Sequence, residues 1–257
     1  MSEIINNDFI LETGCVVKKF RMMEFIHNST GADLFVMIIN RLKILESDYF
    51  DLLYDGIDSN RFWLDHSKLL SRQFDLHRET PLRFCVKFYV PHPNLLEDAY
   101  TRYLFALQIK NDIFTKKLRC SETTMALISS YIVQAEIGDF IEDQCTSLKY
   151  LKTIAQLAEL SEDKLIIIRE FHKNHVGMSA IDSDYALLDT ARKVELYGIR
   201  FHQARDRDNL FLNLSVSNAG VIVFKGYTKI NTFCWEKIRK LSFKRRKFIL
   251  KLHTDEC

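Results

Sequence analysis

Basic side chains are concentrated near the end of the sequence. Between positions 237 and 251 there are eight lysines and arginines and no acidic residue: Lys237, Arg239, Lys240, Lys244, Arg245, Arg246, Lys247 and Lys251. The segment 194–257 has a net charge of +7, whereas the whole chain carries only +2. Concentrated positive charge attracts anionic lipid head groups, at about 1 kcal/mol per basic side chain near the membrane surface. The cluster therefore predicts a lipid-binding surface.

Two other interpretations of the basic cluster stand beside this one. Lys-Arg-Arg-Lys at a hairpin turn also keeps a strand edge soluble and deters pairing with other chains. Nucleic acid is a second anionic ligand, and Phe243 and Phe248 flank the cluster. Strand alternation, however, would turn these two rings into the core rather than present them as a stacking platform. We therefore expect anionic lipid and no nucleic acid.

The other reactive side chains lack the partners that chemistry requires. His172 and His175 are three apart with no third ligand nearby, whereas zinc sites have three or four ligands, so helix capping and packing is the preferred role. The closest glycines, Gly220 and Gly226, lie six apart, which excludes a P-loop, a dinucleotide fingerprint and a nucleophile elbow. The six cysteines form no C-x-x-C pair, as expected of reduced cytosolic thiols. We predict no catalytic residue, metal or cofactor.

The elements that must position the basic cluster fall into three groups. Short strands and helices alternate up to Pro91, a densely apolar helical region follows, and β-type sequence returns near position 197. No apolar run reaches the ~20 residues that span a bilayer. The expected strands are Phe20–Ile26, Tyr49–Tyr54, Arg61–Leu64, Leu82–Val90, Leu210–Val216, Val221–Lys225, Thr232–Ser242 and Lys247–His253. The expected helices are Asp33–Leu45, Lys68–Phe74, Leu95–Ile113, Ser121–Ala135, Asp163–His175 and Ser179–Leu196, with extra helix in 152–160.

These stretches together resemble a FERM module, the three-lobed adaptor of ezrin, radixin and moesin. The resemblance rests on Leu45–Phe50, Trp63–Asp65, Tyr100–Tyr103, Leu107–Lys110, Ser130–Asp139, His172–Gly177, Glu195–Ile199, Asn231–Trp235 and Leu241–Phe248. It implies an α+β fold with a ubiquitin-like lobe over 1–90, an acyl-CoA-binding-protein-like helical lobe over 91–193 and a pleckstrin- or phosphotyrosine-binding-like lobe over 194–257. The last phrases most resemble FERM proteins that carry a Rho guanine-nucleotide-exchange domain.

The resemblance also implies a function and its residues. We expect a non-enzymatic adaptor at the cytoplasmic face of the plasma membrane, the cytoskeleton or cell junctions, or alternatively the targeting module of a larger Rho-exchange-factor or tyrosine-phosphatase enzyme. Its implied partners are phosphoinositide head groups, cytoplasmic tails of transmembrane proteins, and cytoskeletal or Rho-pathway proteins. For lipid we assign Lys237, Lys240, Lys244, Arg245, Arg246, Lys247 and Lys68, and for the peptide groove Phe248, Ile249 and Leu250.

Two departures from the family qualify this assignment. Asp65 and Lys68 stand where radixin-like members place lysines that hold inositol phosphate, and an aspartate repels phosphate. The family lobe continues with two more strands and a helix beyond the position of Cys257. We therefore expect an incomplete third lobe, with Phe248, Leu250 and Leu252 on an edge strand of low stability.

Overall fold

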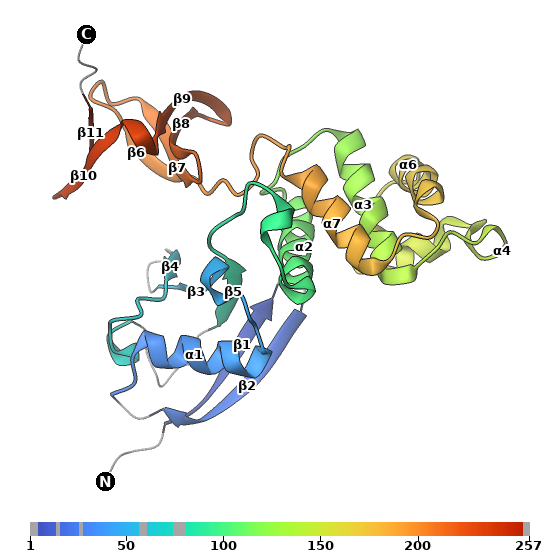
Figure 1. Cartoon of the computed structure of the whole chain (residues 1–257), viewed down its shortest axis with the longest axis horizontal. Helices are drawn as coiled ribbons and strands as arrows, with labels where there is room; N and C mark the ends of the chain where they lie inside the picture. Colours follow the sequence, from blue (N-terminus) through green and yellow to red (C-terminus); the bar gives the residue numbers. More distant parts are fainter. Residues whose placement is uncertain (1–4, 14–15, 26–27, 57–60, 74–80, 254–257) are drawn as a thin grey trace. The chain divides into compact units, whose positions relative to one another are not determined.

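The computed structural model describes residues 5–13, 16–25, 28–56, 61–73 and 81–253 (Figure 1). Contacts between residues divide the chain into two compact units, Met1–Tyr197 and Gly198–Cys257. The first unit contains a β-sheet with one long helix and then an all-helical part, while the second unit is built from strands. In the described ranges, no helix is long and apolar enough to cross a membrane.

The first part of the Met1–Tyr197 unit is a five-stranded mixed sheet. Its order is β2-β1-β5-β3-β4, in which β1 and β5 run parallel and the other neighbours antiparallel. Helix α1 begins with a capping box between Thr30 and Asp33 and buries Leu34 and Ile38 at helical spacing. The elements are β1 (Ile5–Thr13), β2 (Val16–Phe25), α1 (Gly31–Leu42), η1 (Ser47–Tyr49), β3 (Phe50–Asp55), β4 (Arg61–Trp63), η2 (Leu70–Arg72) and β5 (Leu82–Val86).

The loop after β4 is held against the first turn of α1. The Gly31 N–H donates to the carbonyl oxygen of Lys68 at 2.9 Å, and the Ala32 N–H donates to that of His66 at 3.0 Å. These bonds satisfy backbone donors that a helix start leaves without partners. A Cβ atom on Gly31 would lie only 2.3 Å from the Asp65 carbonyl oxygen, so glycine permits this close approach.

The second part of the unit is a bundle of helices. Helices α2, α3 and α7 begin at Asp98, Ser121 and Ser179, whose side chains each accept a hydrogen bond from a backbone N–H of the first turn. Helix α3 packs against α6 and α7, and α2 packs against α7. The elements are η3 (Pro93–Leu95), α2 (Ala99–Phe114), α3 (Glu122–Ile137), α4 (Glu142–Cys145), η4 (Leu148–Thr153), α5 (Ala155–Ala158), α6 (Glu162–His172), η5 (Lys173–His175) and α7 (Ala180–Ala191).

The sheet and the helical bundle of this unit share an aromatic contact. Phe105 of α2 is completely buried, and the rings of Tyr49, Phe50 and Tyr89 meet it edge-on at centroid distances of 5.9, 5.6 and 6.1 Å. A second link is polar: the Glu46 carboxylate accepts the backbone N–H groups of Glu97 and Asp98, at 3.1 and 3.0 Å, where α2 begins. The two parts of the unit therefore share one core.

The Gly198–Cys257 unit contains two antiparallel sheets. One has four strands in the order β6-β7-β8-β9, and its strand β8 is almost wholly buried. The other is the hairpin of β10 and β11. The elements are β6 (His202–Arg205), β7 (Phe211–Ser217), β8 (Gly220–Lys225), β9 (Thr228–Cys234), η6 (Trp235–Lys237), β10 (Ile238–Lys244) and β11 (Lys247–Leu252).

The predicted elements differ from the observed ones in a few places. The expected strand Thr232–Ser242 is two strands, because the 3-10 turn η6 separates β9 from β10. The Trp235 indole N–H donates to the Ser217 carbonyl oxygen at 3.0 Å, which ties this turn to β7. The expected helix Lys68–Phe74 is only the 3-10 turn η2, and Phe74 lies outside the described residues. Strands β1 and β6 are additions to the predicted set.

Candidate functional site

The basic cluster forms the β10–β11 hairpin and the turn before it. Residues 244 and 247 pair with each other, so the hairpin closes through the two residues Arg245 and Arg246. Arg245 has φ +56°, in the left-handed region that glycine and asparagine usually occupy in such turns. All eight basic side chains are exposed. The sequence therefore places its densest positive charge on an exposed two-stranded hairpin.

The register divides the hairpin into two chemically different faces. Directly paired residues share a face, so the pairs Lys240–Lys251 and Lys244–Lys247 lie on one side, with Ser242 and Ile249 between them. We call this the lysine face. The opposite, apolar face carries the pairs Leu241–Leu250 and Phe243–Phe248, and the rings of the second pair lie 5.1 Å apart.

Two expectations for the apolar side chains need correction. Ile249 was grouped with Phe248 and Leu250, but alternation along β11 turns it onto the lysine face. Phe243 was expected in the core, yet its side chain is 80% exposed, because the apolar face of the hairpin is open at this position. Phe248 and Leu250 are half-buried on that face. The three groove residues thus do not form one surface, and Leu241 and Phe243 lie beside two of them.

The charges of the hairpin have no acidic partner in the part of the chain that the structure describes. None of the eight basic residues forms an ion pair there. Lysines of the Met1–Tyr197 unit differ in this respect: Lys173 lies 2.9 Å from Glu170, and Lys193 lies 2.6 Å from Asp189. The positive potential of the hairpin is therefore not neutralised by the described carboxylates.

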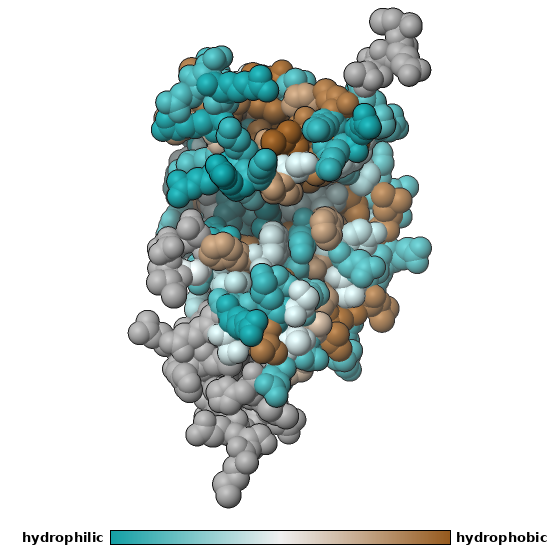
Figure 2. Space-filling view, turned by 90° about the vertical axis from the view of Figure 1, so that its left-hand side faces the viewer, coloured by the Kyte–Doolittle hydropathy of each residue, from teal (hydrophilic) through white to brown (hydrophobic). Residues whose placement is uncertain are grey.

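The hairpin also contains local arrangements that oppose its own stability. Like charges directly opposite each other on neighbouring strands are destabilising, and the lysine face has two such pairs. A left-handed backbone at Arg245 costs about 1–2 kcal/mol relative to a residue without a Cβ clash. Strained or repulsive choices of this kind concentrate at binding sites, where a ligand offsets them. Figure 2 shows, in its upper part, hydrophobic surface bordered by hydrophilic side chains.

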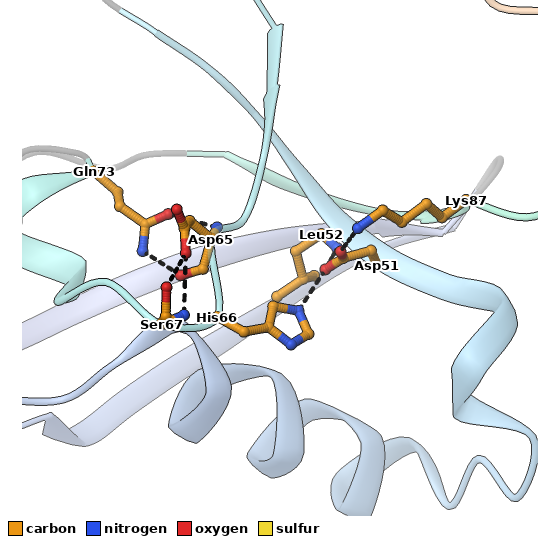
Figure 3. Close-up of polar contacts among 7 residues, drawn as sticks. All are labelled: Asp51, Leu52, Asp65, His66, Ser67, Gln73 and Lys87. Carbon is orange, nitrogen blue, oxygen red and sulfur yellow. Dashed lines mark hydrogen bonds and ion pairs between the residues drawn. The ribbon is translucent and has the colours of Figure 1, made fainter. Parts of the chain in front are cut away.

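The remaining lipid candidate, Lys68, lies on the loop after β4 and is already paired. Its ammonium group is 2.8 Å from the Asp65 carboxylate, which also accepts hydrogen bonds from the Ser67 hydroxyl and N–H (Figure 3). The Lys68 and Ser67 hydrogen bonds lower the pKa of Asp65 to about 2, and Asp65 in turn raises the pKa of Lys68. The charge of Lys68 is therefore already balanced by a carboxylate of its own loop.

A second polar network on the same lobe was not foreseen from the sequence. Asp51 of β3 is only 1% exposed, and its carboxylate accepts the backbone N–H of Leu52 at 2.7 Å (Figure 3). The ring Nε2 of His66 lies 3.0 Å from one oxygen, and the Lys87 ammonium lies 2.6 Å from the other. An aspartate within the apolar run Phe50–Tyr54 was the available signal, because a buried carboxylate requires partners. Lys87 is therefore also neutralised by a carboxylate.

The two histidines of the helical bundle have structural roles, as expected. His172 is buried, and its Nε2 lies 2.9 Å from the Gly138 carbonyl oxygen while Nδ1 lies 3.2 Å from the Tyr150 hydroxyl. A carbonyl can only accept, so Nε2 carries the proton and Nδ1 accepts from Tyr150. Desolvation lowers the pKa of His172 and of His175.

His175 lies within hydrogen-bond distance of the Ser130 hydroxyl, but the two side chains do not form a catalytic pair. Its Nε2 lies 2.8 Å from the Ser130 hydroxyl oxygen, a spacing that a nucleophile and its base could share. Ser130 is completely buried, however, and its hydroxyl proton is donated to the Leu127 carbonyl oxygen. Substrate could not reach this oxygen, so the pair stabilises helix packing. Among the described residues, no cluster of histidine, cysteine and carboxylate side chains could hold a metal ion.

Comparison with known families identifies the three parts of the chain. The FERM N-terminal domain matches residues 19–76, the FERM central domain matches residues 91–202, and the FERM C-terminal PH-like domain matches residues 206–257. The class defined by the fold and its hairpin is thus a three-lobed α+β module of ubiquitin-like, helical and PH-like lobes. The chain belongs to the FERM family.

Individual relatives place the chain within that family. It is similar to the human FERM, ARHGEF and pleckstrin domain-containing protein 2, with 44% identity over 225 residues, 88% of this chain and 21% of that protein. The human tyrosine-protein phosphatase non-receptor type 4 is 36% identical over 256 residues, 99% of this chain and 27% of that protein. The FERM structure of Drosophila Merlin matches with a TM-score of 0.83 at 22% identity, covering 98% of this chain and 87% of that one. The chain spans about a fifth to a quarter of the length of these two curated relatives.

Proposed function

We propose that this chain is a non-catalytic adaptor module that attaches to anionic membrane lipid through the β10–β11 hairpin. The observation that carries the proposal is the set of eight exposed basic side chains without an ion-pair partner among the described residues. Each such side chain near an anionic surface contributes about 1 kcal/mol. The expected place of action is the cytoplasmic face of the plasma membrane and its cytoskeleton or junctions. The functional lobes are 1–90, 91–193 and 194–257.

We propose further that lipid binding depends on the third lobe alone. The first-lobe lysines that could assist, Lys68 and Lys87, are each paired with a carboxylate, Asp65 and Asp51. A phosphate group arriving at either lysine would have to displace an existing ion pair. Lys68 therefore contributes little to affinity, in contrast to Lys244, Arg246 and Lys247.

The protein partner in this proposal is the cytoplasmic tail of a transmembrane protein, or a cytoskeletal or Rho-pathway protein. The apolar face of the hairpin supports this, since Phe248 and Leu250 lie there beside the exposed side chains of Leu241 and Phe243. A targeting role within a larger protein is the second candidate. It is favoured by the relatives, whose names include an exchange-factor domain and a tyrosine phosphatase and whose length the chain covers only in part.

Liposome co-sedimentation tests the lipid proposal. Vesicles containing phosphatidylinositol bisphosphate should retain the wild-type chain, and a variant with Lys244, Arg245, Arg246 and Lys247 all changed to glutamate should lose this binding. A matched control changes Lys149, Lys152, Lys173 and Lys193 of the helical lobe to glutamate, which alters the net charge equally. The proposal is refuted if the hairpin variant sediments with vesicles as the wild type does. It is also refuted if the affinity for generic nucleic acid, measured by gel shift, exceeds the affinity for vesicles.

A further inference from the structure

We propose that the hairpin recognises the charge density of a flat anionic bilayer, rather than the stereochemistry of one inositol phosphate. This inference rests on the proposed lipid function and specifies its ligand: several monovalent anionic lipids, such as phosphatidylserine, bound side by side. It follows from how the register distributes the lysines, which is a property of the hairpin itself.

The spacing of the lysine pairs is the first argument. Lys240–Lys251 and Lys244–Lys247 are separated by four residues along the strands. At about 3.3 Å per residue, the two pairs stand about 13 Å apart on the lysine face. A single inositol ring with neighbouring phosphates can approach one pair closely but not both at their resting positions. Two pairs at this separation match separate head groups in a plane.

The second argument is the lack of orienting groups on the lysine face. Stereospecific ligand sites are concave and use a few fixed polar groups to orient the ligand. Here all four lysines are exposed on a two-stranded ribbon, and an ammonium group acts as a point charge without the planar geometry of a guanidinium. Between the pairs stand only Ser242 and the exposed Ile249. An apolar side chain at that centre suits the boundary between head groups and acyl chains better than a phosphate cage.

The third argument concerns the repulsion within each pair. The two like-charge pairs destabilise the free hairpin, and an anion beside each pair removes that penalty. A single bound head group relieves one pair only, whereas a continuous anionic surface relieves both together. The free energy gained is thus greatest on a surface, and both pairs should contribute equally to binding.

Matched vesicles and paired variants test this inference. One vesicle set carries phosphatidylserine in phosphatidylcholine, and a second carries phosphatidylinositol bisphosphate diluted until the two sets have the same zeta potential. We expect partition coefficients of the wild-type chain that agree within about twofold, because charge density alone sets the electrostatic attraction. Soluble inositol trisphosphate at the same phosphate concentration should not release the protein from phosphatidylserine vesicles.

The two lysine pairs are then removed separately. Lys240→Ala with Lys251→Ala, and Lys244→Ala with Lys247→Ala, should each weaken binding to both vesicle sets about thirtyfold. Each variant should also gain hydrogen-exchange protection in the free hairpin, which shows that it is folded. Lys173→Ala with Lys193→Ala changes the net charge equally and serves as the control, with binding close to wild type.

The possible outcomes separate this inference from the proposed function. Tighter binding to phosphatidylinositol bisphosphate at equal zeta potential, competition by inositol trisphosphate, or loss confined to one lysine pair would overturn the charge-density inference while leaving lipid binding intact. Absence of binding to both vesicle sets would overturn the proposed function itself.

Discussion

Replacing Phe105 with alanine should lower the free energy of unfolding of the Met1–Tyr197 unit by about 3–5 kcal/mol, the usual range for a buried phenylalanine. The side chain is completely buried where the sheet and the helical bundle meet. Three rings contact it edge-on at centroid distances of 5.6–6.1 Å, and each such pair contributes about 0.5–1.5 kcal/mol beyond area burial. Phe105→Leu, which retains most of the volume, should therefore still cost about 1.5 kcal/mol or more.

Urea denaturation followed by circular dichroism measures this loss, and hydrogen exchange shows where it occurs. Because the ring belongs to both parts of one core, protection should fall in β3 and in α2 alike. Phe88→Ala is the matched control: its ring is 59% exposed, and a surface substitution of this kind usually changes stability by about 0.5 kcal/mol or less. The reasoning is refuted if Phe105→Ala costs no more than this control, or if only the helical bundle loses protection.

Four further substitutions or conditions give distinct expectations. Burial raises the pKa of Asp184 to about 6, so folding favours its protonated form. The stability of the protein should therefore fall as pH rises from about 4 through 6. Asp184→Asn should raise the unfolding midpoint at neutral pH but not below pH ~4. Asp189→Asn on the same helix should lower the unfolding midpoint at neutral pH, because lysine and arginine hydrogen bonds lower the pKa of Asp189. Burial lowers the pKa of His172 and of His175 below 6.5. In the Asp184→Asn background, the stability of the protein should therefore fall as pH drops below about 6.5. An NMR titration that shows either imidazole protonated at its ordinary pKa would contradict this expectation. Arg245→Gly should stabilise the hairpin by about 0.5–1 kcal/mol, which hydrogen exchange would detect as increased protection. The same substitution should weaken vesicle binding about fivefold, because it removes one positive charge. A loss of protection would count against the argument that the backbone at Arg245 is strained.

The order of the elements could be predicted because local signals and hydrophobic spacing agree in most of the chain. Ser121 and Ser179 cap α3 and α7 as their sequence positions suggest, and the three prolines near Pro91 mark the change from sheet to helices. The break at η6 is missing from the prediction, although Glu236 and Lys237 interrupt the strand-like residues between Thr232 and Ser242. At this turn the Trp235 indole N–H donates to Ser217 of β7, a contact between segments distant in sequence that local patterns do not reveal.

The candidate site was predictable in composition but not in geometry. The basic residues were identified by counting charge, whereas their division into two faces depends on a register that a one-residue shift would invert. Nothing in the sequence around Arg245 signals a left-handed turn, because no glycine or asparagine stands there. For the same reason the sequence does not reveal that Ile249 lies on the opposite face from Phe248 and Leu250. The partners of Lys68 and Lys87 come from contacts between loop and strands, which charge counting does not reveal.

The Glu46 carboxylate has a consequence for how the chain is made. Glu46 lies about fifty positions before Glu97 and Asp98, whose backbone N–H groups its carboxylate accepts. Glu46 therefore leaves the ribosome before they do. Domains generally fold as units during synthesis, with the N-terminal one first. A folded first lobe would then offer a ready anion to the start of α2 as that helix emerges. The first residues of α2 would thus form hydrogen bonds to a first lobe that is already folded. A fragment beginning near Pro91 would have to initiate α2 without the Glu46 carboxylate.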